Sequence, residues 1–229
     1  MLTLNHVRVH VRTITILRAV TLTVAAGEIV GLVGRNGAGK TTTMRAVMGL
    51  MPIADGTLTF GETDLRRVPA HHRARLGIGY VPEDRRLIPT LTVEENLLLP
   101  AWANRLPEAQ ARLERIYQAM PEVQAFATRR ATQLSGGQQK LVALARALMV
   151  GTRLLLLDEP FEGLAPALAE RMGAAIQTFQ REEGLAVLLA ESEHKHVERL
   201  AQRTYIIERG EIVDHHPNQE GNDGIQTVH

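Results

Sequence analysis

Alternating apolar and polar positions run through the first third of the chain and predict short β-strands. The run from 29 to 33 is apolar apart from one glycine, which indicates a strand buried on both faces, and a glycine-rich turn follows it. Apolar residues then recur at helical spacing after Lys40, until Pro52 and the Asp55-Gly56 pair break the chain. We therefore expect strands at residues 2–9, 20–24, 29–33, 57–60 and 78–81, and a helix at residues 40–49.

The pattern changes between residue 93 and about residue 131, where leucines and other large apolar residues take helical spacing and glycine is absent. We interpret this part as an inserted helical subdomain, which extends to about residue 150. Strands separated by helices then predict a mostly parallel sheet covered on both faces. The polar residues 214–229 show no periodicity and are expected to form a mobile tail. The expected later elements are helices at 136–149, 167–180 and 195–201, and strands at 154–157, 185–190, 204–208 and 211–213.

Composition and charge narrow the class of protein. The chain has 229 residues, of which 45% are apolar and 22% charged, so it can bury a core and is not disordered throughout. Its 26 basic and 25 acidic residues give a net charge of +1, and we expect no nucleic-acid partner because the basic surface of a dedicated binder is missing. There is no cysteine, which excludes disulfides, thiolate chemistry and cysteine zinc sites.

The apolar stretches are short. None approaches the roughly 18 to 20 residues that crossing a bilayer requires. The first ten residues alternate like a strand and contain no apolar leader. We therefore expect neither a membrane span nor an export signal.

A glycine-rich segment after the strand predicted at 29–33 carries the clearest chemical signal. Residues 34–41 read Gly-Arg-Asn-Gly-Ala-Gly-Lys-Thr and match the phosphate-binding pattern G-x-x-x-x-G-K-[ST] between a buried strand and a helix. Such a loop (P-loop) turns backbone N–H groups toward phosphates, while Lys40 can reach the β- and γ-phosphates and Thr41 can bind Mg²⁺. An ordinary glycine-rich turn is the alternative, but the strand, lysine, threonine and helix in register favour a nucleotide site.

A second candidate follows the four leucines at 154–157, where Asp158 and Glu159 end the strand. An acid in this place can hold the water shell of a metal ion, and the next acid can orient or deprotonate an attacking water. Alone, the segment also describes a strand followed by a solvated turn. The P-loop far upstream favours the functional interpretation.

Residues 134–138, Leu-Ser-Gly-Gly-Gln, lie between these two sites, and with this pentapeptide the chain resembles the ATP-binding cassette (ABC) family, whose signature motif it is. Ser135 and two glycines at a helix start form an anion site, although an N-capping serine before a glycine turn also describes them. The resemblance covers residues 1–213. It implies the α/β fold of P-loop NTPases, with an N-terminal antiparallel β subdomain and a helical subdomain inserted in a RecA-like core. It also implies a head-to-tail dimer, in which the signature motif closes on the γ-phosphate held by the other subunit's P-loop.

Three positions differ from the residues that most cassettes carry. Glu83 takes the place of the Q-loop glutamine, which touches Mg²⁺ and relays contact from the membrane partner, and we expect its carboxylate to bind the metal through water. Val11 aligns with the aromatic residue that usually stacks on adenine, so base affinity is expected to be weaker. Ser192 takes the switch position, usually histidine, and can donate one hydrogen bond to a γ-phosphate oxygen without carrying charge. The nearby His194 and His196 are expected to point elsewhere and to be solvated.

Two further segments resemble the ATPases of importers for branched-chain amino acids, urea and amides: residues 82–97, and residues 161–166 at the D-loop position. The resemblance implies an ATPase subunit at the cytoplasmic face of the inner (plasma) membrane. Its implied partners are transmembrane permease subunits, a second cassette subunit that is identical or related, and a periplasmic or extracellular solute-binding protein. The alternatives are the ATPase of a lipid or lipopolysaccharide export system, a soluble cassette protein, and a regulatory subunit that binds ATP without turnover.

The candidate site residues form three groups. Catalysis is assigned to Glu159 and Ser192. Metal binding is assigned to Thr41, Glu83 and Asp158, with Mg²⁺ as the cofactor beside ATP. Nucleotide binding is assigned to Val11, Gly34, Arg35, Asn36, Gly37, Ala38, Gly39, Lys40, Thr41, Thr42, Ser135, Gly136, Gly137 and Gln138.

Overall fold

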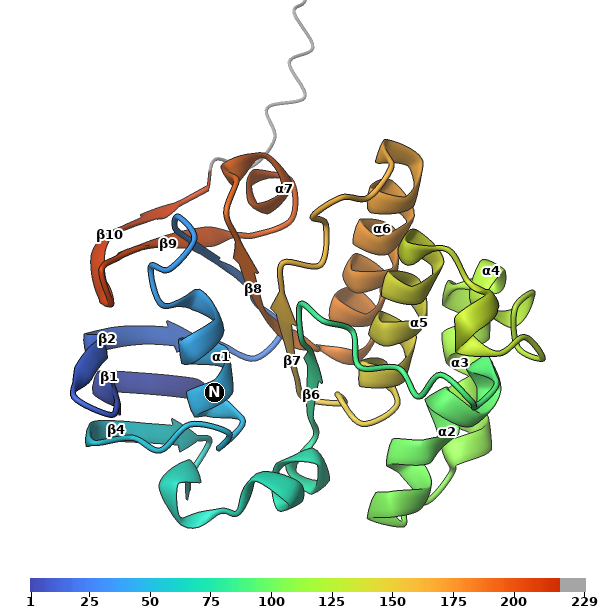
Figure 1. The fold of residues 1–229 in the computed structure, drawn as a ribbon, viewed down its shortest axis with the longest axis horizontal. Helices are drawn as coiled ribbons and strands as arrows, with labels where there is room; N and C mark the ends of the chain where they lie inside the picture. Colours follow the sequence, from blue (N-terminus) through green and yellow to red (C-terminus); the bar gives the residue numbers. More distant parts are fainter. Residues whose placement is uncertain (219–229) are drawn as a thin grey trace, which may run out of the picture.

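A computed structural model describes residues 1–218, which form two β-sheets with helices between and beside them (Figure 1). The smaller sheet is antiparallel, with the strand order β2-β1-β4-β5. Strand β1 and especially β2 extend beyond the predicted segments, because irregularities in their pairing between Leu4 and His10 interrupt the alternation. The strands are β1 (Leu2–Val11), β2 (Ile14–Val24), β4 (Asp55–Phe60) and β5 (Thr63–Asp64).

The larger sheet has six strands in the order β10-β9-β3-β8-β7-β6. Its pairs are parallel except for β10 with β9, which confirms the mostly parallel sheet that the sequence predicts. The strands are β3 (Ile29–Val33), β6 (Ile78–Val81), β7 (Leu154–Asp158), β8 (Ala186–Glu191), β9 (Arg203–Glu208) and β10 (Glu211–Pro217).

Both faces of the larger sheet are covered, so its strands divide their side chains between two cores. Leu154 and Leu156 of β7 pack with Met44 of α1 and with the smaller sheet. Leu155 and Leu157 face the opposite way, into the core formed with α5 and α6. Figure 1 shows α1 between the two sheets and α5 and α6 on the other side of the larger sheet. These three helices are α1 (Lys40–Val47), α5 (Gly136–Leu148) and α6 (Pro166–Glu183).

The chain between β6 and β7 is helical, as predicted, and Figure 1 shows α2, α3 and α4 grouped beyond α5. Thr92 starts α2 with a capping box, because its hydroxyl accepts from the backbone N–H of Glu95 while the Glu95 carboxylate accepts from that of Thr92. None of the helices within residues 1–218 has the length and apolar character that crossing a membrane requires. The remaining helices are α2 (Val93–Asn104), α3 (Ala109–Ala119), α4 (Pro121–Gln124) and α7 (His194–Glu198), with 3₁₀ helices η1 (Leu65–Arg67), η2 (Ala70–Leu76) and η3 (Ala131–Gln133).

The expected polar tail does not begin at residue 214, because β10 continues to Pro217. His215 stacks on Tyr205 of β9 with ring centroids 5.7 Å apart, and the Asn218 side chain donates to the Ala201 carbonyl oxygen over 2.8 Å. The prediction was wrong here because the register shifts after Ile212, which breaks the alternation that marks a strand. The rest of the predicted tail, residues 219–229, lies outside the described residues.

Candidate nucleotide-binding site

The P-loop turns tightly between β3 and α1. Gly39 has a φ of 118°, in the left-handed region that side chains rarely adopt, and it directly precedes the first residue of α1. Gly34 has no room for a side chain, since a Cβ there would lie 2.3 Å from the Ile207 carbonyl oxygen. The loop therefore brings backbone N–H groups and the N-terminus of α1 to one place, which favours anion binding.

Lys40 carries a buried positive charge to the base of this loop, with the residue only 4% exposed. Its Nζ donates to the Gly34 carbonyl oxygen over 2.6 Å and lies 3.0 Å from Glu159 Oε1. The same nitrogen lies 3.0 Å from Ser192 Oγ. The structure thus brings the lysine of the P-loop together with both residues to which the sequence assigns catalysis.

Ser192 lies at the centre of this cluster, immediately after β8. Its Oγ is 2.8 Å from Glu159 Oε1 and 2.9 Å from Asn36 Oδ1. Because a hydroxyl has one proton, Ser192 donates to one of these oxygens at a time while accepting from Lys40. The serine therefore reaches both the P-loop and the carboxylate that follows β7.

The backbone of Glu159 adopts a φ of 50°, which is unfavourable for a residue with a side chain. Two hydrogen bonds hold it there. Its N–H donates to the Ala190 carbonyl oxygen over 2.9 Å, and its own carbonyl oxygen accepts from Lys140 Nζ over 2.9 Å. Neighbouring elements thus fix the direction in which the Glu159 carboxylate points.

Asp158 and Thr41 form the part of the site that suits a metal ion. The Thr41 hydroxyl donates to Asp158 Oδ1 over 3.1 Å. Burial raises the pKa of Asp158 to about 6; the hydrogen bond from Thr41 acts against this, while the charges of Glu159 and Glu83 add to it. A divalent cation would offset that crowded negative charge, and hard oxygen donors are those that Mg²⁺ prefers.

The protein supplies only part of a metal shell. Within residues 1–218 no group of three or more His, Asp and Glu side chains is arranged to hold a metal ion. Mg²⁺ commonly binds through one or two carboxylates, with substrate phosphates and water completing its octahedron. Thr41 and Asp158 fit that kind of site, and the expected water-mediated binding of the metal by Glu83 stays a prediction.

Two hollows flank the P-loop. One, of about 470 Å³, is lined by Thr42, Glu83 and Glu159 together with Ile16 from β2. Val11, which the sequence assigns to the adenine, does not line it; Val11 is 41% exposed at the end of β1, and its role stays a prediction. The sequence did not assign Ile16 to the nucleotide site, because the alternation predicts that its strand starts only at residue 20.

The second hollow, of about 630 Å³, is lined by Arg35, Asn36 and Ala38 on the other side of the loop. His194 also lines it and is exposed, and it does not line the hollow beside Lys40 and Glu159. His196, which is expected to be solvated, is only partly exposed. Its ring stacks on Phe161 with centroids 5.0 Å apart, because α7 packs against the loop after β7.

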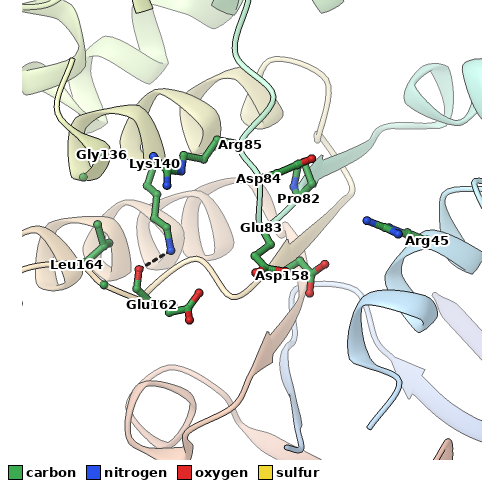
Figure 2. Close-up of a pocket in the computed structure, with 12 residues that line it drawn as sticks. Arg45, Pro82, Glu83, Asp84, Arg85, Gly136, Lys140, Asp158, Glu162 and Leu164 are labelled. Carbon is green, nitrogen blue, oxygen red and sulfur yellow. Dashed lines mark hydrogen bonds between the residues drawn. The ribbon is translucent and has the colours of Figure 1, made fainter. Parts of the chain in front are cut away.

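The signature motif lies at the start of α5 and lines a different hollow. The Ser135 hydroxyl accepts from the Gln138 N–H over 3.3 Å, and the Gln138 side chain accepts from the Ser135 N–H over 2.9 Å, which is a capping box. Gly136 and Gly137 line a hollow of about 580 Å³, shown in Figure 2, whose wall also includes Asp158. One copy of the chain therefore does not bring its signature residues into the hollow lined by its P-loop lysine.

A buried carboxylic acid, Glu191, was not singled out by the sequence, where it appears only as the polar end of an apolar strand. It is 3% exposed, and its Oε1 accepts from the Phe161 N–H over 3.0 Å. Burial raises its pKa to about 7, although the hydrogen bond from Phe161 acts in the opposite direction. At neutral pH this group is thus close to its protonation midpoint.

Glu191 should make the stability of the chain fall as the pH rises toward neutrality. Because its pKa is raised from 4.5 to about 7 on folding, its contribution is full below about pH 4.5 and is lost as the pH rises through about 7. We expect Glu191→Gln to remove roughly 1–3 kcal/mol of the decline in unfolding free energy across this window. Urea unfolding of both proteins at a series of pH values measures this. Asp158, whose pKa is also raised, adds the same pH dependence to the stability of both proteins, and its contribution cancels when they are compared. An identical slope of unfolding free energy against pH in the variant would therefore contradict the prediction.

The fold and the site together define a class. A mostly parallel sheet that carries a P-loop after β3, with Asp158 and Glu159 at the end of β7, is the arrangement of a P-loop nucleotide hydrolase. The chain belongs to the ABC transporter family, since residues 17–162 match the family described as ABC transporter. It is an ATP-binding cassette with ATPase activity, the nucleotide-hydrolysing subunit of a transporter.

Individual relatives agree with this assignment. The high-affinity branched-chain amino acid transport ATP-binding protein BraG of Pseudomonas aeruginosa is 36% identical over 94% of this chain and 92% of its own length. The lipopolysaccharide export system ATP-binding protein LptB of Escherichia coli K12 is also 36% identical, over 86% of this chain and 82% of its own. The solved dimeric cassette MJ0796, described as a bacterial ABC transporter cassette, superposes with a TM-score of 0.86 at 25% identity, covering 96% of this chain and all of that one. The ABC ATPase fold predicted from the sequence is thereby confirmed.

Proposed function

We propose that the chain powers an importer for branched-chain or other amino acids, or for urea or amides. The observation that carries this proposal is the likeness to BraG, which extends over 94% of the chain at 36% identity. The segments 82–97 and 161–166 support it, because they resemble the same group of importers. The permease is a separate set of subunits in this proposal, and the cassette attaches to them at the cytoplasmic face of the membrane.

The site residues have distinct proposed roles in ATP hydrolysis. The N–H groups of residues 34–41 and the Lys40 ammonium bind the phosphates, replacing partners such as Gly34 O and Glu159 that Lys40 has in this structure. Mg²⁺ held by Thr41 and Asp158 would neutralise phosphate charge. Glu159 accepts a hydrogen bond from the attacking water and orients it toward the γ-phosphate, and Ser192 donates to a γ-phosphate oxygen.

The second half of each site comes from another cassette subunit in this proposal. Gly136 and Gly137 of the signature motif line a hollow that Lys40 does not line, and the hollow beside Lys40 does not include them. A head-to-tail dimer would place this motif of each chain against ATP on the other. ATP would then hold the two subunits together, and hydrolysis would release them.

The resemblance to LptB supports a second candidate, a cassette that drives lipid or lipopolysaccharide export. The two candidates differ in their partners, because only an importer of the proposed kind uses an extracytoplasmic solute-binding protein. The cassette itself does not contact the solute in either case. The substrate therefore has to be determined on the assembled transporter.

Purification of the tagged full chain from membranes in mild detergent tests the proposal. We expect permease subunits and a cassette partner to co-purify, and we expect the ATPase rate of the reconstituted complex to rise several-fold with a solute-binding protein loaded with leucine, another amino acid or urea. Stimulation by lipid or lipopolysaccharide instead would favour the export function. Recovery of ribosomes or nucleic acid without a permease would overturn both.

Ser192 should limit the rate of hydrolysis, and Ser192→His should raise it. An imidazole has a second ring nitrogen, can carry charge and extends further from the backbone than a hydroxymethyl group. We expect steady-state turnover of ATP to increase by about three- to tenfold, which is less than the roughly 100-fold or more of a fully positioned proton donor, because Ser192 can already donate one hydrogen bond. Ser192→Ala, which removes the hydroxyl, should lower turnover. Equal rates in all three proteins would remove Ser192 from the mechanism.

A further inference from the structure

Lys140 is a buried cation that does not line the P-loop hollow. It belongs to α5, two residues past the signature motif, and is 8% exposed. Its Nζ donates to the carbonyl oxygens of Glu159, over 2.9 Å, and Glu162, over 2.5 Å. Figure 2 shows the side chain reaching from α5 to the loop at Glu162. One ammonium group thus joins the signature helix to both ends of the loop 159–162.

Glu191 holds the same loop from the opposite side. Its carboxylate, at the end of β8, accepts from the Phe161 N–H in the middle of the loop. Burial lowers the pKa of Lys140 and raises the pKa of Glu191, and the attraction between the two charges opposes both changes. A buried ammonium and a buried carboxyl group therefore hold three backbone sites within the loop, at Glu159, Phe161 and Glu162.

The first of these sites is the one under strain. Glu159 has a φ of 50°, and a non-glycine residue keeps such a backbone only when its surroundings hold it. Its N–H is held by Ala190 and its carbonyl oxygen by Lys140. Without the ammonium, one of these two restraints is lost. The loop can then relax toward a more ordinary conformation, which would turn the carboxylate away from Lys40 and Ser192.

We propose that Lys140 is a positioning residue for ATP hydrolysis, which fixes the loop 159–162 so that Glu159 is aimed at the P-loop. The proposal rests on the role of Glu159 proposed above. Lys140 itself touches neither nucleotide nor water in this mechanism. Lys140 extends from α5, the helix that begins with the signature motif. In the proposed dimer it therefore links the signature motif, which contacts the ATP bound to the partner, with Glu159, which acts on the ATP bound to its own chain.

The test compares Lys140→Met with Lys195→Met in the purified full chain. Methionine keeps an unbranched apolar side chain and removes the ammonium, while Lys195 is exposed on α7 and serves as the matched control. We expect Lys140→Met to lower turnover at saturating ATP by roughly 10- to 100-fold, the scale of a small misplacement of a catalytic group. The Kd of a fluorescent ATP analogue should stay within about threefold, because the P-loop is untouched. Lys195→Met should match the wild type in both.

A double variant separates positioning from stability. Lys140→Met removes a positive charge that attracts the buried Glu191, and the loss of that charge and its hydrogen bonds destabilises the fold. Adding Glu191→Gln removes that charge while its amide oxygen still accepts from the Phe161 N–H. We expect the melting temperature to recover in the double variant while turnover stays low, because the two carbonyl oxygens remain unheld. Recovery of turnover together with melting temperature would overturn the proposal.

Glu159→Gln, measured in parallel, distinguishes two kinds of failure. If Glu159→Gln is inactive while Lys140→Met turns over ATP within twofold of wild type, the proposal for Lys140 is wrong and the role of Glu159 stands. If Glu159→Gln keeps the wild-type rate, the proposed role of Glu159 is wrong, and with it the proposal for Lys140. A parallel fall in turnover and nucleotide affinity in Lys140→Met would show a general structural effect and would also overturn it.

Discussion

Replacing Glu159 by glutamine should reduce ATP turnover by at least about 100-fold, the contribution expected of a general base or water-orienting carboxylate. The glutamine keeps the shape of the side chain but loses the negative charge that attracts the water's protons. Binding should not weaken, because the variant also removes the ion pair of 3.0 Å between Glu159 and Lys40, which ATP has to break. Steady-state phosphate release measures the turnover, and titration of a fluorescent ATP analogue measures the affinity.

The same variant should accumulate in an ATP-bound dimer. If ATP joins two chains and hydrolysis separates them, a chain that binds without hydrolysing stays assembled, which size-exclusion chromatography with and without ATP would detect. The control is Glu162→Gln, which changes a second carboxylate that lines the same hollow. We expect this control to keep its rate within about twofold, the size of effect typical of a charge outside the reacting centre. Wild-type turnover in Glu159→Gln would remove this carboxylate from the mechanism.

The sequence predicted the parts of the site whose spacing determines their geometry. A P-loop between a strand and a helix has few possible conformations, so Gly34, Lys40 and Thr41 could be assigned from the pattern alone. The parallel sheet then brings the end of β7 to the same edge as the P-loop, which placed Asp158 beside Thr41. These assignments combine local sequence motifs with one rule of topology, that parallel strands bring their carboxyl ends to the same edge of the sheet.

What the sequence did not predict depends on register and on long-range contact. The extra length of β2 and the continuation of β10 were missed because irregular pairing interrupts the alternation. Ile16 was missed for the same reason. The hydrogen bonds from Lys140 to the loop after β7 join residues about twenty positions apart. The hydrophobic periodicity of a sequence predicts helices and strands, but it does not predict which backbone carbonyl a side chain on a helix reaches.

Arg73 is another contact of this kind, and it anchors the far end of the helix that carries Lys40. The residue lies in η2 and is only 4% exposed. Its guanidinium donates to the carbonyl oxygens of Ala46, over 2.9 Å, and of Val47, both at the end of α1. It also donates to the carbonyl oxygens of Leu65 and Val68, over 2.6 and 3.1 Å. At the end of α1 the guanidinium adds to the hydrogen bond that the Ala46 carbonyl oxygen accepts from the Gly49 N–H over 3.0 Å, and it places a cation where the helix dipole favours one.

Arg73→Met should therefore destabilise the chain by about 3 kcal/mol, because several hydrogen bonds to a charged group are lost while the cost of burying that charge is recovered. For a domain of this size, the melting temperature should fall by roughly 6–12 °C. Arg75→Met, two residues further along the same 3₁₀ helix at an exposed position, is the matched control and should melt with the wild type. Thermal unfolding by circular dichroism compares the three proteins. If Arg73→Met and Arg75→Met have the same melting temperature, the four hydrogen bonds from Arg73 to carbonyl oxygens make no net contribution to stability. The end of α1 would then be held by its apolar contacts alone.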